Sequence, residues 1–293
     1  MTDNDKITFW EESWRRFKTL SPMDKNDNGN QDRRLKRWNQ MAAEFAKNTS
    51  DEKAQKRRQE VLAMLIKKDV LTPKTKVLDI GAGPGYWAVS MAAMVAHVTA
   101  LEPAEAMTAI LKEQIKERKI SNISIDMRTF QQIDLEKENR QGVFDLVFAS
   151  MTPGIDGPGA LYKMMAASKK YCYLSAFSGS GWQKEYDQLW QELFEEDMGR
   201  RSNDIIYPFN LLYALGYRPG LEFHFWKRKR SWDREQAIEH YCLMVEERKG
   251  LTPTLKERIV AFVDRRYKDG ALRISDQVCQ GIMVWDKNDR VES

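Results

Sequence analysis

Two acidic residues and three alternating glycines have the types and the spacing to bind a small ligand. Asp79 belongs to an apolar and β-branched run, residues 76–80, which predicts a buried parallel strand. Gly81, Gly83 and Gly85 follow at once, and glycines in a turn allow a ligand to approach the backbone closely. The next apolar run predicts a helix, so the segment has the form of the first half of a nucleotide-binding α/β unit.

The spacing of the glycines decides which nucleotide fits. A dinucleotide fingerprint reads G-x-G-x-x-G, whereas this chain has G-x-G-x-G with Asp79 two residues before it. A carboxylate at this place would repel a pyrophosphate and attract a cation. Glu102 ends the next predicted strand, 21 positions after Gly81, where an acid reaches the hydroxyls of a ribose. An adenosine without phosphates but with an amino-acid cation satisfies both acids, and S-adenosylmethionine is such a ligand.

Three segments of the chain resemble the class I S-adenosylmethionine-dependent methyltransferases. Residues 79–85, Asp-Ile-Gly-Ala-Gly-Pro-Gly, are similar to the family's first motif. Residues 101–107, Leu-Glu-Pro-Ala-Glu-Ala-Met, resemble the second motif, whose acid holds the ribose. Residues 144–150, Phe-Asp-Leu-Val-Phe-Ala-Ser, resemble the strand whose end borders the methyl group. The resemblance covers residues 38–180 and implies a methyltransferase (EC 2.1.1 class) of the small-molecule type. A related domain that has lost its ligand, or binds another nucleotide, is the alternative.

Alternating strands and helices predict the fold. Strands are predicted at 77–80, 97–101, 123–127, 144–149 and 170–176, with helices at 85–95, 104–118 and 158–167. This alternation predicts a parallel sheet with helices on both faces. The resemblance adds an antiparallel pair, for which residues 221–226 and 277–285 are the candidates. The expected fold class is α/β, a Rossmann-like, doubly wound, mostly parallel sheet of seven strands.

Further helices are predicted on both sides of this core. They lie at 7–20, 35–45, 51–70, 182–198, 207–217, 233–248 and 252–268. We divide the chain into an N-terminal helical cap, residues 1–70, and a Rossmann-like domain, residues 71–293, with a helical insertion at about 231–270. The insertion is expected to join the N-terminal helices in a cap over the active site. The aromatic face of helix 7–20 fits either packing on the body of the protein or a lid.

The resemblance assigns cofactor contacts to residues at the predicted strand ends. The backbone of the glycine turn would line the methionine moiety and Asp79 would face its amino group. The implied residues are Asp79, Gly81, Ala82, Gly83, Gly85, Glu102, Pro103, Met107, Thr129, Phe130, Ser150, Met151 and, as a lid, Trp38. Core packing is the alternative for Trp38, Met107, Phe130 and Met151. No catalytic residue is assigned, because methyl transfer mainly requires an acceptor held about 3–3.5 Å from the methyl carbon.

The loop after the fourth predicted strand bears on the acceptor. It reads Ser-Met-Thr-Pro-Gly-Ile-Asp at 150–156, in place of the Asn/Asp-Pro-Pro-aromatic loop of the DNA- and protein-amide-methylating relatives. A small, partly apolar or cationic acceptor under an aromatic cap is expected. Position alone suggests Thr152, Asp156, Trp182, Tyr186 and Tyr207 as substrate-facing side chains.

Two other functions stay open. In an RNA (tRNA or rRNA) methyltransferase the basic run 226–230 would contact phosphate, although it also reads as a solvated strand end. A non-catalytic S-adenosylmethionine-binding protein is the third hypothesis. The basic cluster 56–58 reads as a solvated helix face.

Composition excludes several other classes. The net charge of +4 comes from 47 basic and 43 acidic residues, so it does not demand a nucleic acid. The 3 Cys and 3 His lack the spacing of a disulfide framework or a metal site. The N-terminus lacks the pattern of a signal peptide, and no apolar run is long enough for a membrane span. A cytoplasmic protein without a metal and without membrane association is expected, and its oligomeric state is left open.

Overall fold

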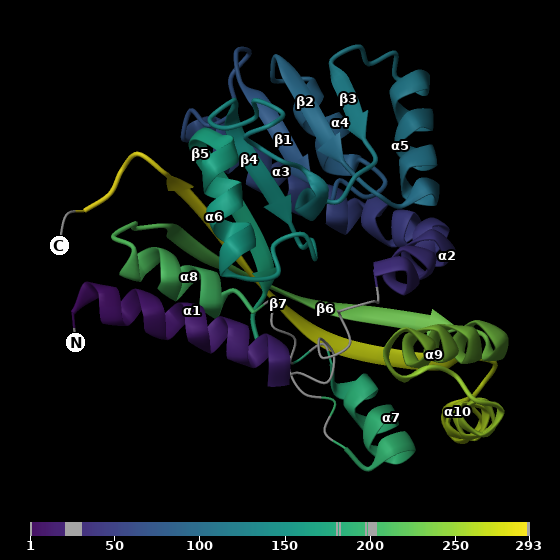
Figure 1. Cartoon of the computed structure of the whole chain (residues 1–293). Helices are drawn as coiled ribbons and strands as arrows, with labels where there is room; N and C mark the ends of the chain where they lie inside the picture. Colours follow the sequence, from purple (N-terminus) through teal and green to yellow (C-terminus); the bar gives the residue numbers. More distant parts are fainter. Residues whose placement is uncertain are drawn as a thin grey trace.

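Seven strands form one sheet in the order β3-β2-β1-β4-β5-β7-β6 (Figure 1). The computed structural model describes residues 2–20, 31–179, 181, 183–196, 198 and 204–291. The strands are β1 (Lys76–Ile80), β2 (His97–Leu101), β3 (Ile123–Asp126), β4 (Phe144–Ser150), β5 (Ser168–Phe177), β6 (Gly220–Trp232) and β7 (Leu272–Asp286). β1 to β5 are parallel, and β7 runs antiparallel to both β5 and β6. The predicted mostly parallel, seven-stranded α/β sheet is confirmed.

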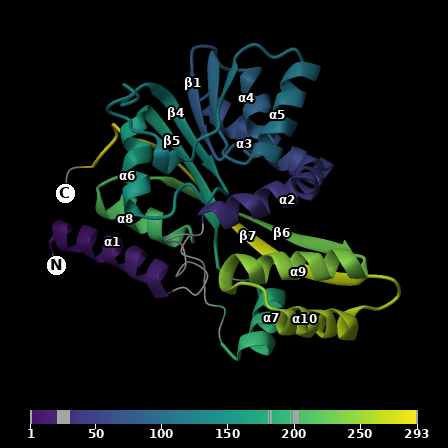
Figure 2. The same cartoon turned by 45° about the vertical axis from the view of Figure 1, so that its right-hand side comes forward.

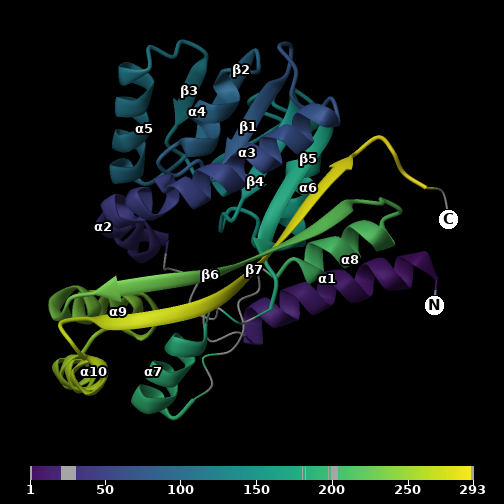
Figure 3. The same ribbon diagram turned by 180° about the vertical axis from the view of Figure 1, so that it is seen from behind.

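Helices cover both faces of the sheet (Figures 1 and 3). α3 (Glu52–Lys67), α4 (Tyr86–Ala92) and α5 (Glu105–Glu117) pack on one face, against a core that includes Phe148 of β4. α6 (Pro158–Ala167) and α8 (Ile206–Ala214) pack on the other, against a core that includes Val147. Because neighbouring residues of a strand point to opposite faces, a continuous apolar run such as β4 fills both cores.

Local sequence signals set the ends of several helices. The side chain of Asp51 accepts a hydrogen bond from Ala54 N at the start of α3. Asp233 and Thr252 cap α9 (Arg234–Lys249) and α10 (Pro253–Arg266) in the same way, as the sequence predicts. These two helices form the connection between β6 and β7.

The β6–β7 hairpin is longer than predicted. β5 pairs with β7 only over residues 280–286, whereas β6 pairs with β7 over its whole length. The free half of the hairpin therefore extends past the parallel strands, and α7 (Lys184–Phe194), α9 and α10 pack on it around a third apolar core (Figure 3). The predicted strand 221–226 ended too early, because the residues from Lys227 to Arg230 are all charged and show no alternation of apolar and polar side chains.

The helices before β1 go to different places (Figure 2). α2 (Gln31–Ser50) lies between α5 and α9, where Arg37 pairs with Glu247 at 2.6 Å. α1 (Asp3–Leu20) packs on α8 and α6, with Trp14 fully buried and stacked on Tyr207. The apolar face of α1 joins the core beneath α6 and α8, and the cap formed with the insertion stays a prediction.

The described residues contain neither a candidate membrane span nor a candidate metal-binding cluster. None of the helices in this part of the chain combines the length and the apolar character needed to cross a membrane. Nowhere in it do three or more His, Cys, Asp or Glu side chains gather as they would to hold a metal ion.

Candidate cofactor-binding site

The ends of β1 and β2 bring the glycine turn and both predicted acids together. The backbone N–H groups of Gly81 and Ala82 both donate to the carbonyl of Leu101, each at 2.9 Å. The turn therefore crosses the carboxyl end of β2, the edge where open α/β sheets bind their ligands.

Glu102 fixes the glycine turn through its carboxylate. The side chain is buried, and its Oε2 accepts a hydrogen bond from Gly83 N at 2.8 Å. Its Oε1 accepts from Ala104 N, also at 2.8 Å. Burial raises the pKa of this carboxyl, and the two backbone donors act in the opposite direction. An ionised carboxylate accepts about four hydrogen bonds, so Glu102 keeps acceptor capacity for two ligand hydroxyls.

Asp79 is a buried carboxylate, and one of its two oxygens has no hydrogen-bond partner among the described residues. Its side chain is 1% exposed, and Oδ2 has no hydrogen-bond partner among the described residues. Burial, together with the nearby Glu102 carboxylate, raises the pKa of Asp79 to about 8. A buried charge is costly unless it is paired. The ammonium group of an amino-acid ligand would supply the missing partner, and the residues present therefore fit S-adenosylmethionine.

Two glycines are required by the path of the turn. Gly81 has φ +70°, and a Cβ on it would lie 2.1 Å from Oγ1 of Thr152. Gly85 has φ +88°, and a Cβ on it would lie 2.1 Å from Cδ1 of Leu111. Both positions combine a left-handed backbone with a close neighbour, so the predicted glycine motif has a steric cause.

α2 covers the turn and the start of α5. Asn39 Oδ1 accepts a hydrogen bond from Ala106 N in the first turn of α5, at 2.9 Å. Trp38 meets the ring of Phe45 edge-on, and both pack around Met107, which is 2% exposed. Phe45 also borders Gly83. Trp38 and Met107 are thus packed together, and their contacts with a cofactor stay predictions. Sequence reasoning missed Asn39, because its partner is 67 positions away.

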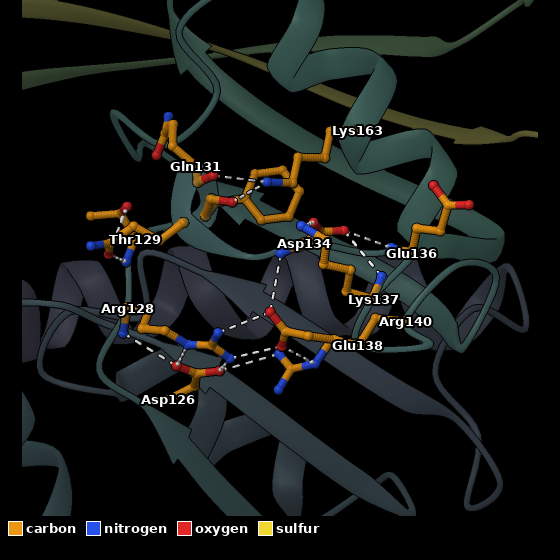
Figure 4. A network of polar contacts seen from close by, with 12 residues as sticks. Asp126, Arg128, Thr129, Gln131, Asp134, Glu136, Lys137, Glu138, Arg140 and Lys163 are labelled. Atoms are coloured by element: carbon orange, nitrogen blue, oxygen red, sulfur yellow. Dashed lines mark hydrogen bonds and ion pairs between the residues drawn. The ribbon is translucent and has the colours of Figure 1, made fainter.

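A network of charged residues orders the loop after β3 (Figure 4). Arg128 pairs with Asp126 and with Glu138, each at 2.8 Å. Arg140 adds a second contact to Asp126 at 3.2 Å. The hydrogen bonds from Arg128 lower the pKa of both Asp126 and Glu138. The loop that carries the predicted adenine contacts is thereby held against β3.

The two predicted adenine residues differ in their surroundings. Thr129 begins a short 3-10 helix, where it forms a capping box with Gln132. The ring of Phe130 is 2% exposed and packs in the core, so for this side chain the packing alternative holds. Lys163 of α6 donates to the Phe130 carbonyl at 2.6 Å and holds the same loop (Figure 4).

Polar side chains from three strands meet beyond the end of β4. Ser150 Oγ and Ser175 Oγ lie 3.1 Å apart, and Gln280 Nε2 donates to Ser175 Oγ at 2.9 Å. Met151, the next residue, has φ +52° and donates its N–H to the Ser175 carbonyl. The sequence suggested Ser150 and Met151, whose place beside the cofactor stays a prediction. It did not suggest Ser175 and Gln280, which have no motif around them.

The five suggested substrate-facing residues do not form one group. Thr152 is buried against Gly81, and Asp156 pairs with Lys18 of α1 at 2.6 Å. Tyr186 is buried in the core of the hairpin helices, where its hydroxyl meets His240, and Tyr207 stacks on α1. For both tyrosines the structure favours packing over a substrate contact. Trp182 lies outside the described residues.

Removing the Glu102 carboxylate is expected to weaken cofactor binding. Glu102→Ala leaves two backbone donors and the ribose hydroxyls without an acceptor, a loss of about 1–3 kcal/mol. That loss corresponds to roughly a 5- to 150-fold rise in Kd for S-adenosylmethionine by titration calorimetry. Glu105→Ala removes an exposed acid three residues away and serves as the control. Unchanged affinity in Glu102→Ala would show that the ribose assignment is wrong.

Known proteins match both the sequence and the fold. A family model described as a methyltransferase domain matches residues 77–169. An uncharacterized protein of Haemophilus influenzae is 24% identical over 257 residues, which cover 87% of this chain and 90% of that protein. The YcgJ protein of Bacillus subtilis superposes with a TM-score of 0.52 at 14% identity, covering 80% of this chain and 100% of that one. A proposed methyltransferase of Bacillus halodurans superposes with a TM-score of 0.51 at 16% identity, covering 77% and 98%.

At these low sequence identities the two solved structures support the fold alone. The family model matches the stretch from β1 to the start of β5. That stretch holds the glycine turn, Glu102 and the end of β4. The chain therefore contains a methyltransferase domain, and its motifs resemble those of the class I S-adenosylmethionine-dependent methyltransferases.

Proposed function

We propose that this protein transfers the methyl group of S-adenosylmethionine to a small-molecule acceptor. The observation that carries the proposal is the pair of buried acids under the glycine turn. Asp79 has a carboxylate oxygen without a partner among the described residues, and Glu102 keeps free acceptor capacity beside it. One acid suits an ammonium group and the other a ribose, so together they match the two ends of this cofactor.

Each element of the site has a proposed role. The backbone of Gly81, Ala82, Gly83 and Gly85 lines the methionine moiety, and Glu102 with Pro103 holds the ribose. The loop with Thr129 and Phe130 borders the adenine. Met107 of α5 and Trp38 of α2 border it on the side that α2 covers. Ser150 and Met151 border the sulfur.

In the reaction, the protein itself orients the acceptor and keeps water away from the site. When bound, the sulfonium supplies an already activated methyl group. Ser150 at the end of β4, Ser175 near the end of β5 and Gln280 within β7 form a connected polar group, which can orient an acceptor beside the methyl carbon. α2 closes over the turn and limits the access of water. We assign no general base, because an acceptor that is already deprotonated needs none.

The arrangement of the basic run favours a small acceptor over RNA. Arg228 and Arg230 both pair with the buried Asp276, at 2.9 and 2.6 Å. Lys227 and Lys229 are exposed on the opposite face of β6, because side chains alternate along a strand. The run therefore does not present a continuous phosphate-binding stripe, and its reading as a solvated strand end is corrected for the two arginines. A cytoplasmic location remains a prediction from the sequence.

A label-transfer experiment tests the function. The protein is incubated with methyl-labelled S-adenosylmethionine and either a deproteinised small-molecule extract of the source cells or bulk tRNA. We expect label in a small molecule and S-adenosylhomocysteine in equal amount. Label in tRNA would establish the RNA alternative, and cofactor binding without any transfer would favour the non-catalytic one.

A further inference from the structure

Two neighbouring arginines at the start of α3 span the distance between the glycine turn and β6. The guanidinium of Arg58 lies over the ring of Tyr86, 5.1 Å from its centre, and Tyr86 directly follows the glycine turn. The guanidinium of Arg57 lies over the ring of Trp226 in β6, 4.7 Å from its centre. The predicted solvated helix face is thus corrected, since both arginines are half-buried over aromatic rings and Lys56 alone is exposed.

This pair lies on the side of the sheet where an acceptor would sit. Gln280 of β7 donates a hydrogen bond to Ser175. Trp226 of β6 lies opposite Val278 of β7. Val278 is two residues from Gln280, so Trp226 and Gln280 lie on the same face of the hairpin. Arg57 therefore lies against the face of the hairpin that also carries Gln280. The C-terminal end of α2 closes this region, because Arg58 donates to the Thr49 carbonyl at 2.5 Å.

Neither arginine forms an ion pair with an acid within the described part of the chain. Arg57 makes no ion pair or hydrogen bond there, and the described hydrogen bond of Arg58 goes to an uncharged carbonyl. Burial lowers the pKa of Arg58 and the adjacent charge of Arg57 adds to this, whereas Tyr86 and Asp51 act in the opposite direction. Two like charges that are partly removed from water are costly side by side, and an anion bound between them would offset this cost.

The adjoining part of β6 is also rich in positive charge. Arg228 and Arg230 share the carboxylate of Asp276, and Arg230 Nε is buried without a hydrogen-bond partner among the described residues. Burial, with four surrounding arginines as the next cause, lowers the pKa of His240 to about 3. Several arginines therefore gather along this part of β6 and α9, where Asp276 and Glu247 are their ion-pair partners.

We propose that the methyl acceptor is a small anion, carrying a carboxylate or a phosphate, which Arg57 and Arg58 bind on the α3 side of the site. This inference rests on the proposed function and replaces the partly apolar or cationic acceptor that the aromatic content suggested. Guanidinium groups bind carboxylates and phosphates alike through paired hydrogen bonds. The half-buried position under α2 favours a small anion over the backbone of a nucleic acid.

The first test uses the charge of the acceptor. A deproteinised extract is separated on an anion exchanger, and the retained and unretained fractions are offered separately with labelled S-adenosylmethionine. Label only in the retained fraction supports the inference. Phosphatase treatment of that fraction then separates the two chemistries, since it abolishes transfer to a phosphate and leaves transfer to a carboxylate. Label in the unretained fraction, or in bulk tRNA, overturns the inference but leaves the methyltransferase function standing.

The second test uses Arg57, which can be changed without breaking a described hydrogen bond. Arg57→Met is expected to raise KM for the retained acceptor about 10- to 100-fold, as for loss of a charge-assisted contact, with kcat and the Kd for S-adenosylmethionine unchanged. Arg57→Lys keeps the charge and should recover most of the loss. Lys56→Met removes the exposed neighbouring charge and is the control. An unchanged KM in Arg57→Met, or an equal effect in Lys56→Met, overturns the inference, whereas no transfer and no cofactor binding in the wild type overturns the proposed function itself.

Discussion

Asp79→Asn is expected to stabilise the ligand-free protein at pH 8 and, at the same time, to weaken its binding of S-adenosylmethionine. The folded protein holds Asp79 in a buried place that raises its pKa from the ordinary 3.8 to about 8. Between these two pH values the folded state binds more protons than the unfolded state. The free energy of unfolding of the wild type therefore falls as pH rises through this window, by about 1.4 kcal/mol per pH unit at most.

Asparagine has no proton to lose, so the variant lacks this decline. The two proteins should melt alike at pH 4 and diverge toward pH 8, with the variant more stable. The variant also lacks the charge that pairs with the ligand ammonium, a loss of about 1.5–3 kcal/mol, or roughly 10- to 150-fold in Kd. Differential scanning calorimetry over pH 4–8, with titration of the cofactor at pH 8, checks both effects.

A matched control comes from an exposed acid far from the site. Asp289→Asn removes a carboxyl that is exposed at the C-terminal end of the chain, and it should change neither the pH dependence of melting nor the cofactor affinity. If Asp79→Asn melted like the wild type at pH 8, the carboxylate would have a partner that the structure does not describe. If it bound the cofactor as tightly as the wild type, Asp79 would not face the amino group.

Gly81→Ala is expected to abolish measurable cofactor binding. The new Cβ would lie 2.1 Å from Thr152 Oγ1 in a backbone with φ +70°, so the turn must move away from the end of β1. The left-handed conformation alone costs about 1–2 kcal/mol for a residue with a Cβ. We expect a rise of at least about 100-fold in Kd, since the moved turn no longer offers its backbone to the ligand.

The neighbouring loop supplies the control for this steric argument. Gly157 has an extended backbone, φ 172°, and a Cβ on it meets no atom within 4 Å. Gly157→Ala should therefore leave the melting temperature and the Kd for S-adenosylmethionine unchanged. Tight binding by Gly81→Ala, measured by the same calorimetric titration, would contradict the assigned path of the glycine turn.

Features that depend on short stretches of sequence could be predicted. The strand, glycine turn and helix at 76–92, the acid at the end of β2 and the caps Asp233 and Thr252 all follow from local rules. The glycine spacing is explained by contacts within the turn and its neighbours, Thr152 and Leu111. For this reason the sequence could predict the fold and the steric need for glycine in the turn.

Features that depend on distant partners could not be predicted. Arg230 reads as a solvated residue until Asp276, 46 positions later, is seen beside it. Arg57 and Arg58 read as part of a polar helix face until Trp226 and Tyr86 are placed under them. The proposed anion-binding side of the site depends on such contacts between α2, α3 and β6, and local sequence patterns do not reveal them.

The most direct test of the central claim is a calorimetric titration of the ligand-free protein with S-adenosylmethionine, S-adenosylhomocysteine and NAD. Both sulfur-containing ligands carry the ribose and the ammonium group that Glu102 and Asp79 are proposed to hold, whereas NAD carries a pyrophosphate that Asp79 would repel. We expect micromolar binding of the first two and no binding of NAD. Binding of NAD, or failure of both adenosyl ligands to bind, would contradict the assignment of this site.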